Sequence, residues 1–305
     1  MKSTQRISWK SLVRDKYLII MILPVVLYFI LFSYLPMYGV IISFKDYSIG
    51  KGIWGSPWVG LKYFKQFFEG FFFFRLLSNT LLISVYNILW GFPLPIIFAL
   101  VLNEFRDGAF KRTIQTISYL PHFISLVVIC GMIVNFASPQ DGIINVLLKA
   151  VSGDTVNFLG SSKWFRTIYI SSGIWQQFGW DSIIYLAALS GIDPNLYEAA
   201  KIDGASRWQQ LLSITLPGIK ATTIILLILS LGNMMSVGFE KIILLYSPAT
   251  YETADVISTY VYRMGLQNAQ YSFSAAVGLF NSLINISLLI GCNWISKKVT
   301  DVGIW

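Results

Sequence analysis

The residues of this chain best suited to contact with a partner form a polar segment, 193–217, between two hydrophobic stretches. Asp193 followed by Pro194 is typical of a helix start, because the aspartate side chain caps the first turn and proline fits the first helical position. Gly204 suits the left-handed residue that ends such a helix, and Glu198 places a charge between the two ends. In a chain that is 55% hydrophobic, this segment predicts a docking surface for a partner that works in water. The alternative is a helix pair that only covers the end of a bundle.

A second short helix is predicted after this glycine. Ser206 and Gln209 have the spacing of a capping box, in which each residue satisfies a backbone N–H of the other. Trp208 and Leu211 share an apolar face of this helix, and Pro217 is expected to end it before the next hydrophobic stretch. The glycine also has small neighbours, which would let another backbone approach closely: Ala199, Ala200 and Ala205.

No set of side chains in the sequence predicts catalysis. There is no combination of nucleophile, base and acid, no metal-ligand spacing and no phosphate-binding loop, so we expect neither enzymatic activity nor a cofactor or metal in this chain. Cys130 and Cys292 fall in apolar stretches and are interpreted as small buried hydrophobes, and the lone His122 as a structural residue. The net charge of +8 is attributed to cytoplasmic loops beside anionic lipid, because no dense basic patch predicts nucleic-acid binding.

The composition places the polar segment in a protein that crosses the membrane several times. Only 12% of the 305 residues are charged, against roughly 25% in a soluble domain. A transmembrane helix needs about 20 mainly apolar residues, and prolines within such helices predict kinks. The sequence predicts an all-α fold with a tail at 1–16, one membrane domain at 17–295 that includes the polar loop at 191–217, and a short C-terminal segment at 296–305. The domain is expected to hold six spans: 17–42, 76–102, 114–136, 167–190, 221–246 and 275–295.

Basic residues predict the orientation. The short connection 103–113 holds Arg106, Lys111 and Arg112 beside span ends, which places it and both termini in the cytoplasm. The first span lacks a cleavage signal and is followed by further spans, so it is interpreted as a retained helix. Two loops then face the other side. One, 43–75, is aromatic and is expected to lie in the membrane interface; the other, 137–166, is expected to carry a short interfacial helix.

The polar segment resembles the EAA loop of binding-protein-dependent ABC importer permeases. The family pattern is E-A-A-x-x-x-G, nine further residues, then I-x-L-P. It is matched here by Glu198, Ala199, Ala200, Gly204, Ile214, Leu216 and Pro217, and Asp203 and Ala205 also match the version found in MalF-like sugar importers. Two positions depart from it: Leu211 replaces a common phenylalanine and Ala221 a common proline.

Other parts of the chain are similar to one branch of this family. Two runs resemble the LplB-type oligosaccharide and polysaccharide permeases: Tyr34-Leu35-Pro36-Met37-Tyr38-Gly39 and Gly238-Phe239-Glu240-Lys241. The resemblance implies the type I importer permease fold and a role in forming half of a pathway for a carbohydrate, with an oligosaccharide expected. It also implies three kinds of partner in the cell membrane or beside it: a second homologous permease, a dimer of ATPase subunits that binds ATP and Mg, and an extracellular solute-binding protein.

The resemblance also implies roles for the residues of the loop. Glu198 would contact the ATPase, Gly204 would permit the bend, and Trp208 and Leu211 would pack against the ATPase or the base of the bundle. A self-contained secondary transporter or channel is the alternative. It would need inverted repeats or ionisable groups deep in several spans, whereas Asp181 and the neighbourhood of Glu240 are the main examples here.

Polar and aromatic residues of the spans are candidates for contact with a sugar. Aromatic faces stack on the C–H surfaces of sugars, and amides and carboxylates bind their hydroxyls. The alternative for each is a hydrogen bond that joins helices, or, for Glu240, a pair with Lys241 at the outer interface. The candidates are Tyr86, Asn87 and Trp90 in the second span, Trp175, Gln176, Gln177, Trp180 and Asp181 in the fourth, Asn233 and Glu240 in the fifth, and Asn281 and Asn285 in the sixth.

Overall fold

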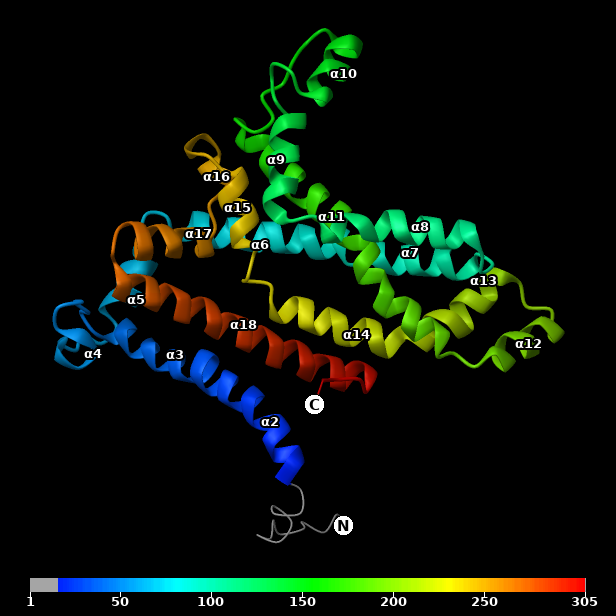
Figure 1. The fold of residues 1–305 in the computed structure, drawn as a ribbon, viewed down its shortest axis with the longest axis horizontal. Helices are drawn as coiled ribbons and strands as arrows, with labels where there is room; N and C mark the ends of the chain where they lie inside the picture. The colour runs from blue at the N-terminus through cyan, green and yellow to red at the C-terminus, as the bar shows by residue number, and fades with distance from the viewer. Residues whose placement is uncertain (1–15, 305) are drawn as a thin grey trace.

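The computed structural model describes residues 16–304, which form an all-α protein (Figure 1). The predicted tail, 1–16, lies outside the described residues except for Lys16. Among the residues described, extended pairing is limited to an isolated antiparallel bridge between Lys45 and Trp58. In chain order the first half comprises α2 (Lys16–Phe29), η1 (Ile30–Tyr34), α3 (Leu35–Met37), η2 (Tyr38–Phe44), α4 (Gly52–Gly55), α5 (Lys62–Phe68), α6 (Phe73–Tyr86), η3 (Asn87–Gly91), α7 (Pro93–Glu104), α8 (Ala109–Tyr119), η4 (Leu120–Phe123), α9 (Leu126–Phe136) and α10 (Ile143–Ser152).

The second half contains the longest uninterrupted helices. It comprises α11 (Ser162–Ser190), α12 (Pro194–Ile202), α13 (Arg207–Gln210), η5 (Leu211–Thr215), α14 (Leu216–Gly232), α15 (Phe239–Leu245), η6 (Pro248–Thr250), α16 (Tyr251–Ala254), α17 (Ile257–Tyr262), η7 (Arg263–Gln267) and α18 (Tyr271–Thr300). The helix pair α12 and α13 lies at one end of the bundle, and α4, α5 and α17 lie at the other (Figure 1).

Four helices in the described part of the chain are long and apolar enough to cross a membrane. They are Lys16–Phe44, Phe73–Glu104, Arg207–Gly232 and Tyr271–Thr300, and the bent pair Ala109–Phe123 and Leu126–Phe136 is a fifth candidate. These helices confirm the prediction of a helical, multiply spanning protein. The predicted fourth span lies in α11, which has 29 residues and is therefore about 43 Å long, but its polar residues keep it out of this set.

The predicted third span, 114–136, is wrong as a single helix. The chain bends by 96° between Phe123 and Leu126. Proline 121 starts the short 3-10 turn η4, and Ser125 adopts an extended backbone and caps α9 by accepting the N–H of Val128 at 3.4 Å. The helix breaks here because a proline N–H is missing on one side and a new cap forms on the other.

The predicted fifth span, 221–246, is also wrong at both ends. Helix α14 stops at Gly232, and a non-helical stretch separates it from α15. The freed backbone is held by Asn285 of α18, whose Oδ1 accepts the N–H of Met235 at 2.9 Å and whose Nδ2 donates to Ser236 Oγ at 2.8 Å. At its start the helix is continuous from Arg207, so Pro217 does not end the preceding element as expected.

Three prolines within the spans follow local π-helical turns. The turns η1, η3 and η5 each end two residues before a proline: Pro36, Pro93 and Pro217. Because proline lacks an N–H and its ring collides with the carbonyl four residues earlier, a wider turn relieves the contact without ending the helix. At these three prolines the helix therefore widens and continues, whereas Pro24 lies within the regular helix α2.

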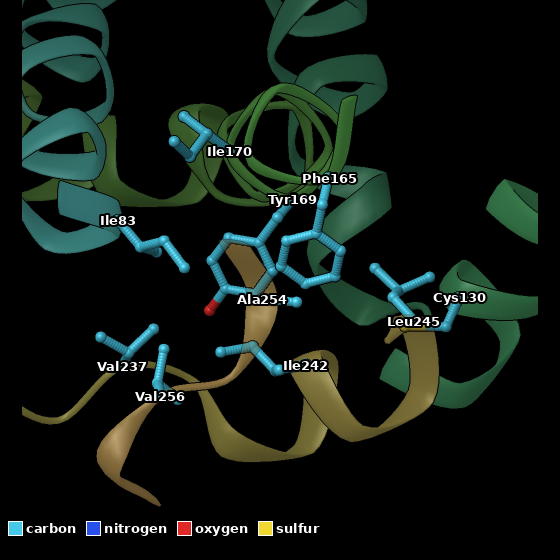
Figure 2. Packing of buried hydrophobic residues seen from close by; sticks show 10 residues of the cluster. All are labelled: Ile83, Cys130, Phe165, Tyr169, Ile170, Val237, Ile242, Leu245, Ala254 and Val256. Atoms are coloured by element: carbon cyan, nitrogen blue, oxygen red, sulfur yellow. The ribbon is translucent and has the colours of Figure 1, made fainter. Parts of the chain in front are cut away.

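The buried core consists of three clusters along the bundle. Figure 2 shows one, in which Tyr169 and Phe165 of α11 pack between Ile83 of α6 and Ile242 of α15. A second joins α5, α6, α17 and α18 around Phe67. The third lies near the polar loop, and joins α7, α11 and α14 through Ala99, Tyr185, Leu189 and Ile219.

Two arginines share one fully buried carboxylate at the end of the bundle that carries α17. Arg263 contacts both oxygens of Asp255, at 3.2 and 2.6 Å, and Arg75 lies 3.6 Å from Oδ2. Thr259 Oγ1 also donates to Asp255 Oδ1 at 2.8 Å, and Asn79 Nδ2 donates to the Asp255 carbonyl at 2.9 Å. This cluster ties the irregular segment between α15 and α18 to the start of α6.

The aromatic segment between the first two long helices folds back on itself. Lys45 is buried and lies over the rings of Trp54 and Trp58, whose own outer surfaces are exposed. Tyr63 donates to Asp46 Oδ1 at 2.5 Å; burial and this hydrogen bond raise the pKa of Tyr63 to about 12. Exposed aromatic rings on a compact segment fit the predicted position in a membrane interface.

Candidate functional site: a polar loop and an interior cavity

The first helix of the polar loop has the caps that its sequence predicts. Asp193 Oδ1 accepts the N–H of Asn195 at 3.0 Å. At the other end Gly204 has a φ of +78°, in the left-handed region. The N–H of Ala205 donates to the Ala200 carbonyl at 2.8 Å, and that of Gly204 to Lys201 at 3.1 Å. These two bonds form a Schellman motif, so the predicted C-terminal glycine is confirmed.

The capping box of the second helix is also present. Ser206 Oγ accepts the N–H of Gln209 at 3.3 Å, and Gln209 Oε1 accepts the N–H of Ser206 at 2.7 Å. Gln210 Nε2 donates to the Ala205 carbonyl at 2.8 Å. The backbone N–H groups of Gly204, Ala205 and Ser206 all have partners within the loop. The loop's own hydrogen bonds therefore hold α12 and α13 at their angle.

The loop is also attached to the bundle. Tyr197 and Thr215 are hydrogen-bonded through their hydroxyls at 3.0 Å, which links α12 to η5. Leu216 packs on the core cluster of α7, α11 and α14. Arg207 lies 3.2 Å from Glu104 at the end of α7, although an exposed pair of this kind adds only about 1 kcal/mol or less. These contacts connect the loop to the spans.

One surface of the loop faces away from the bundle. The exposed residues of the predicted surface are Glu198, Ala199, Asp203, Gly204 and Pro217, and the half-buried ones are Ala200, Ala205, Leu211 and Leu216. The Glu198 carboxylate has no hydrogen bond or ion pair within residues 16–304. Trp208 is 66% exposed and Ile202 is 88% exposed. Sequence reasoning overlooked Ile202; its signal was an isoleucine between Lys201 and Asp203 at the end of a short helix. An unpaired carboxylate and exposed apolar side chains on one loop are compatible with the predicted docking surface, which stays a prediction.

A cavity of about 650 Å³ lies among α6, α7, α11, α14 and the segment that follows α14. Five of the predicted pathway residues line it: Asn87, Gln176, Gln177, Asp181 and Asn233. Gln177 Oε1 lies 2.9 Å from His122 Nδ1, and Gln176 is buried with its amide 3.5 Å from the Ile124 carbonyl. The cavity is thus lined by amide and carboxylate groups of several spans, which suits a hydroxylated ligand.

The other predicted pathway residues lie elsewhere. The ring of Trp180 stacks on His122 with centroids 4.2 Å apart. Tyr86, Trp90 and Trp175 have exposed side chains outside the cavity. Asn285 holds the backbone after α14, which is the helix-joining role that its position also allowed. Asn281 has a buried Oδ1 without a hydrogen-bond partner, and Glu240 is exposed.

Lys241 is a cavity residue that sequence reasoning interpreted differently. It lines the cavity and is 6% exposed, whereas its neighbour Glu240 points outward, and no ion pair joins them in the described structure. The adjacent opposite charges suggested a pair at the interface. The turn back into α15 separates the two side chains instead, because neighbouring residues on a helix do not face each other.

The fold and these two features define a class. An exposed helix pair at one end of a helical membrane protein and a polar cavity among its spans are features of a transport protein. Residues 91–301 match the family described as "Binding-protein-dependent transport system inner membrane component", and the chain belongs to this family. It is therefore a membrane component of an importer that works with a binding protein.

Curated relatives and a solved structure extend the match to nearly the whole chain. Protein LplB of Bacillus subtilis is 45% identical over 98% of this chain and 94% of its own length. The polygalacturonan/rhamnogalacturonan transport system permease protein YteP of the same organism is 45% identical over 97% and 92%. A chain from a bacterial ABC transporter involved in import of the acidic polysaccharide alginate is 46% identical, with a TM-score of 0.89 over 96% of this chain and 99% of its own. That transporter has also been solved in complex with an alginate pentasaccharide-bound periplasmic protein.

Proposed function

We propose that this chain forms half of the pathway for an oligosaccharide and is driven by a separate ATPase that docks on the loop between α11 and α14. The observation that carries the proposal is the loop itself. Its caps hold Glu198, Ile202 and Trp208 on an exposed surface. Exposed apolar side chains on an ordered loop favour a partner that covers them. ATP and Mg would be bound by the ATPase, and this chain would supply no catalytic group.

The continuous helix after the loop supports a mechanism for coupling. Arg207–Gly232 has 26 residues and is therefore about 39 Å long. Its first residues belong to the docking surface, and residues near its last turns, among them Leu229 and Ser230, line the cavity. A displacement of Trp208 by the ATPase would thus shift the wall of the cavity through a single rigid element.

The carbohydrate assignment is supported by the relatives and by the cavity. YteP is named for polygalacturonan and rhamnogalacturonan, and the solved transporter for alginate. In this chain, Asn87, Gln177, Asp181 and Asn233 present amides and a carboxylate to the cavity. These groups are suited to binding sugar hydroxyls.

A second permease subunit is proposed to complete the pathway. The first long helix, Lys16–Phe44, exposes nearly every apolar side chain from Tyr17 to Tyr38 and contributes none of the buried core over its most apolar part. Lipid and a homologous subunit would cover this helix together. We propose that the two copies of the permease fold are non-identical and bind a dimer of ATPase subunits.

The orientation follows from the position of the loop. If α12 and α13 face the cytoplasm, where ATP is available, then α4, α5 and α17 face outward, because they lie at the opposite end of the bundle (Figure 1). An extracellular solute-binding protein would approach that end. Both termini of the chain are proposed to be cytoplasmic, which is consistent with the basic connection at Arg106, Lys111 and Arg112.

Co-purification with the ATPase tests the proposal. Glu198→Ala removes the unpaired carboxylate of the docking surface, and Lys298→Ala, at the exposed end of α18, is the matched control. We expect the permease with the control substitution to co-purify with the ATPase. The double variant Glu198→Ala, Trp208→Ala should not co-purify with it. Undiminished ATPase binding and transport by the double variant would exclude this loop as the coupling surface.

A further inference from the structure

Lys241 is the buried cation of the cavity. Its side chain is 6% exposed and lines the cavity together with Tyr169 and Gly173 of α11. The ammonium donates one hydrogen bond, to the Tyr169 carbonyl at 2.9 Å, and lies 5.0 Å from the centroid of the Tyr169 ring. A lysine ammonium has three donors, so the contacts in the structure use only part of its capacity.

The ammonium has no acidic partner. No carboxylate lies within ion-pair distance of it among residues 16–304. Asp181, the acid of the same cavity, is eight residues beyond Gly173 on α11 and thus about 12 Å further along the helix. Burying an unpaired charge is costly and marks a functional position in a membrane protein more often than a structural one.

Helix α11 leaves space for this charge. A Cβ added at Gly173 would lie 3.2 Å from Lys241 Nζ, so a larger residue there would crowd the ammonium. Beyond the glycine, the cavity wall continues with Gln176, Gln177 and Asp181. The wall therefore offers one positive charge at one level and hydroxyl-binding groups at the next.

We propose that Lys241 binds a carboxylate of the transported saccharide, which makes a uronic-acid oligosaccharide the preferred substrate class. This inference rests on the proposed function and identifies Lys241 as the residue that would recognise the negative charge of the saccharide. A single ammonium balances a singly charged carboxylate. It does not balance a phosphate, which carries more than one negative charge, and the cavity lacks an arginine among its lining residues. Gln176 and Gln177 would then receive the hydroxyls of the neighbouring ring.

The test uses the complete importer in proteoliposomes, with its second permease, ATPase and binding protein. The probes are an oligogalacturonate and the same oligosaccharide fully methyl-esterified, which removes its charge. Each is supplied at a saturating concentration of loaded binding protein, so only the permease differs between assays. The variants are Lys241→Gln, Lys241→Arg and the control Lys298→Gln, which makes the same change in charge at an exposed site.

We expect Lys241→Gln to import the acidic saccharide roughly tenfold to a hundredfold more slowly than the original chain, the range for loss of a hydrogen bond to a charged group. Import of the neutral ester should change less than twofold or so, and Lys241→Arg should restore part of the acidic transport. Equal loss of both saccharides would overturn the proposal in favour of a structural role, as would unchanged acidic transport. If the original importer moves neither saccharide while hydrolysing ATP, the carbohydrate function itself fails.

Discussion

The turn at Gly204 offers a test in which backbone geometry is separated from side-chain contact. Gly204 has a φ of +78°, and a Cβ added there would meet no atom within 4 Å. A substitution therefore introduces no collision. Its effect on the free permease comes only from the left-handed backbone, which most L-residues avoid and asparagine tolerates.

The magnitude follows from this geometry. Gly204→Ala costs about 1–2 kcal/mol in the left-handed conformation, Gly204→Val costs more, and Gly204→Asn costs less. Unwinding the turn would not relieve this strain at a lower cost in free energy. It would break the bonds from Ala205 to Ala200 and from Gly204 to Lys201, each worth about 1 kcal/mol net. The population of the native turn falls by at most roughly 5- to 30-fold in the alanine variant.

The assay is the affinity of the purified permease pair for its ATPase. Because the ATPase would bind only the native turn, its apparent Kd rises by the factor by which that turn is depopulated. We expect the order of affinity to be glycine, asparagine, alanine, valine. The unfolding temperature of the bundle should stay nearly constant, because Gly204 is exposed and outside the core clusters.

Two results would refute this reasoning. If the valine variant binds the ATPase as tightly as the glycine form, the turn does not position the docking surface. If asparagine is as damaging as valine, the left-handed backbone is not the cause of the loss.

Three further predictions concern stability and local order. Gly179→Ala places a Cβ 2.6 Å from the Ser118 carbonyl carbon, so we expect α11 and α8 to separate at a cost of about 1–3 kcal/mol. This cost should lower the unfolding temperature. The control Gly278→Ala, which has open space around its Cβ, should leave the unfolding temperature unchanged. Asp255→Asn leaves Arg263 and Arg75 without their buried carboxylate and should cost about 3 kcal/mol in the same assay, whereas the exposed Glu252→Gln should have little effect. Ser206→Ala removes one half of the capping box and costs about 1 kcal/mol; faster amide exchange at residues 207–210 should report it, and unchanged exchange would contradict the cap.

Local features of the loop could be predicted because they depend on near neighbours in sequence. Asp193, Gly204, Ser206 and Gln209 act within four residues of their own positions, so residue type and spacing suffice. The same holds for the long apolar helices, whose length and composition are set by the bilayer. The family pattern added the role of the loop, which geometry alone left open.

Breaks in the spans could not be predicted in this way, because they depend on distant partners. Helix α14 ends where Gly232 meets Leu289 of α18, at 2.5 Å from an added Cβ, and where Asn285 accepts the freed N–H of Met235. Trp180 resembles a sugar-stacking residue, but it stacks on His122, which lies just before a bend that hydropathy does not reveal. Lys241 enters the cavity only because the chain changes direction after that break (Figure 1).

The central claim is that import through this chain is driven by a separate ATPase acting on the loop between α11 and α14. The most direct measurement is uptake of a labelled oligosaccharide into proteoliposomes that contain the permease pair, with loaded binding protein outside, and with or without the ATPase and ATP inside. We predict uptake only when both the ATPase and ATP are present, and its loss in the Glu198→Ala, Trp208→Ala variant. Uptake by the permease pair alone, driven by a gradient of the sugar or of an ion, would contradict the account.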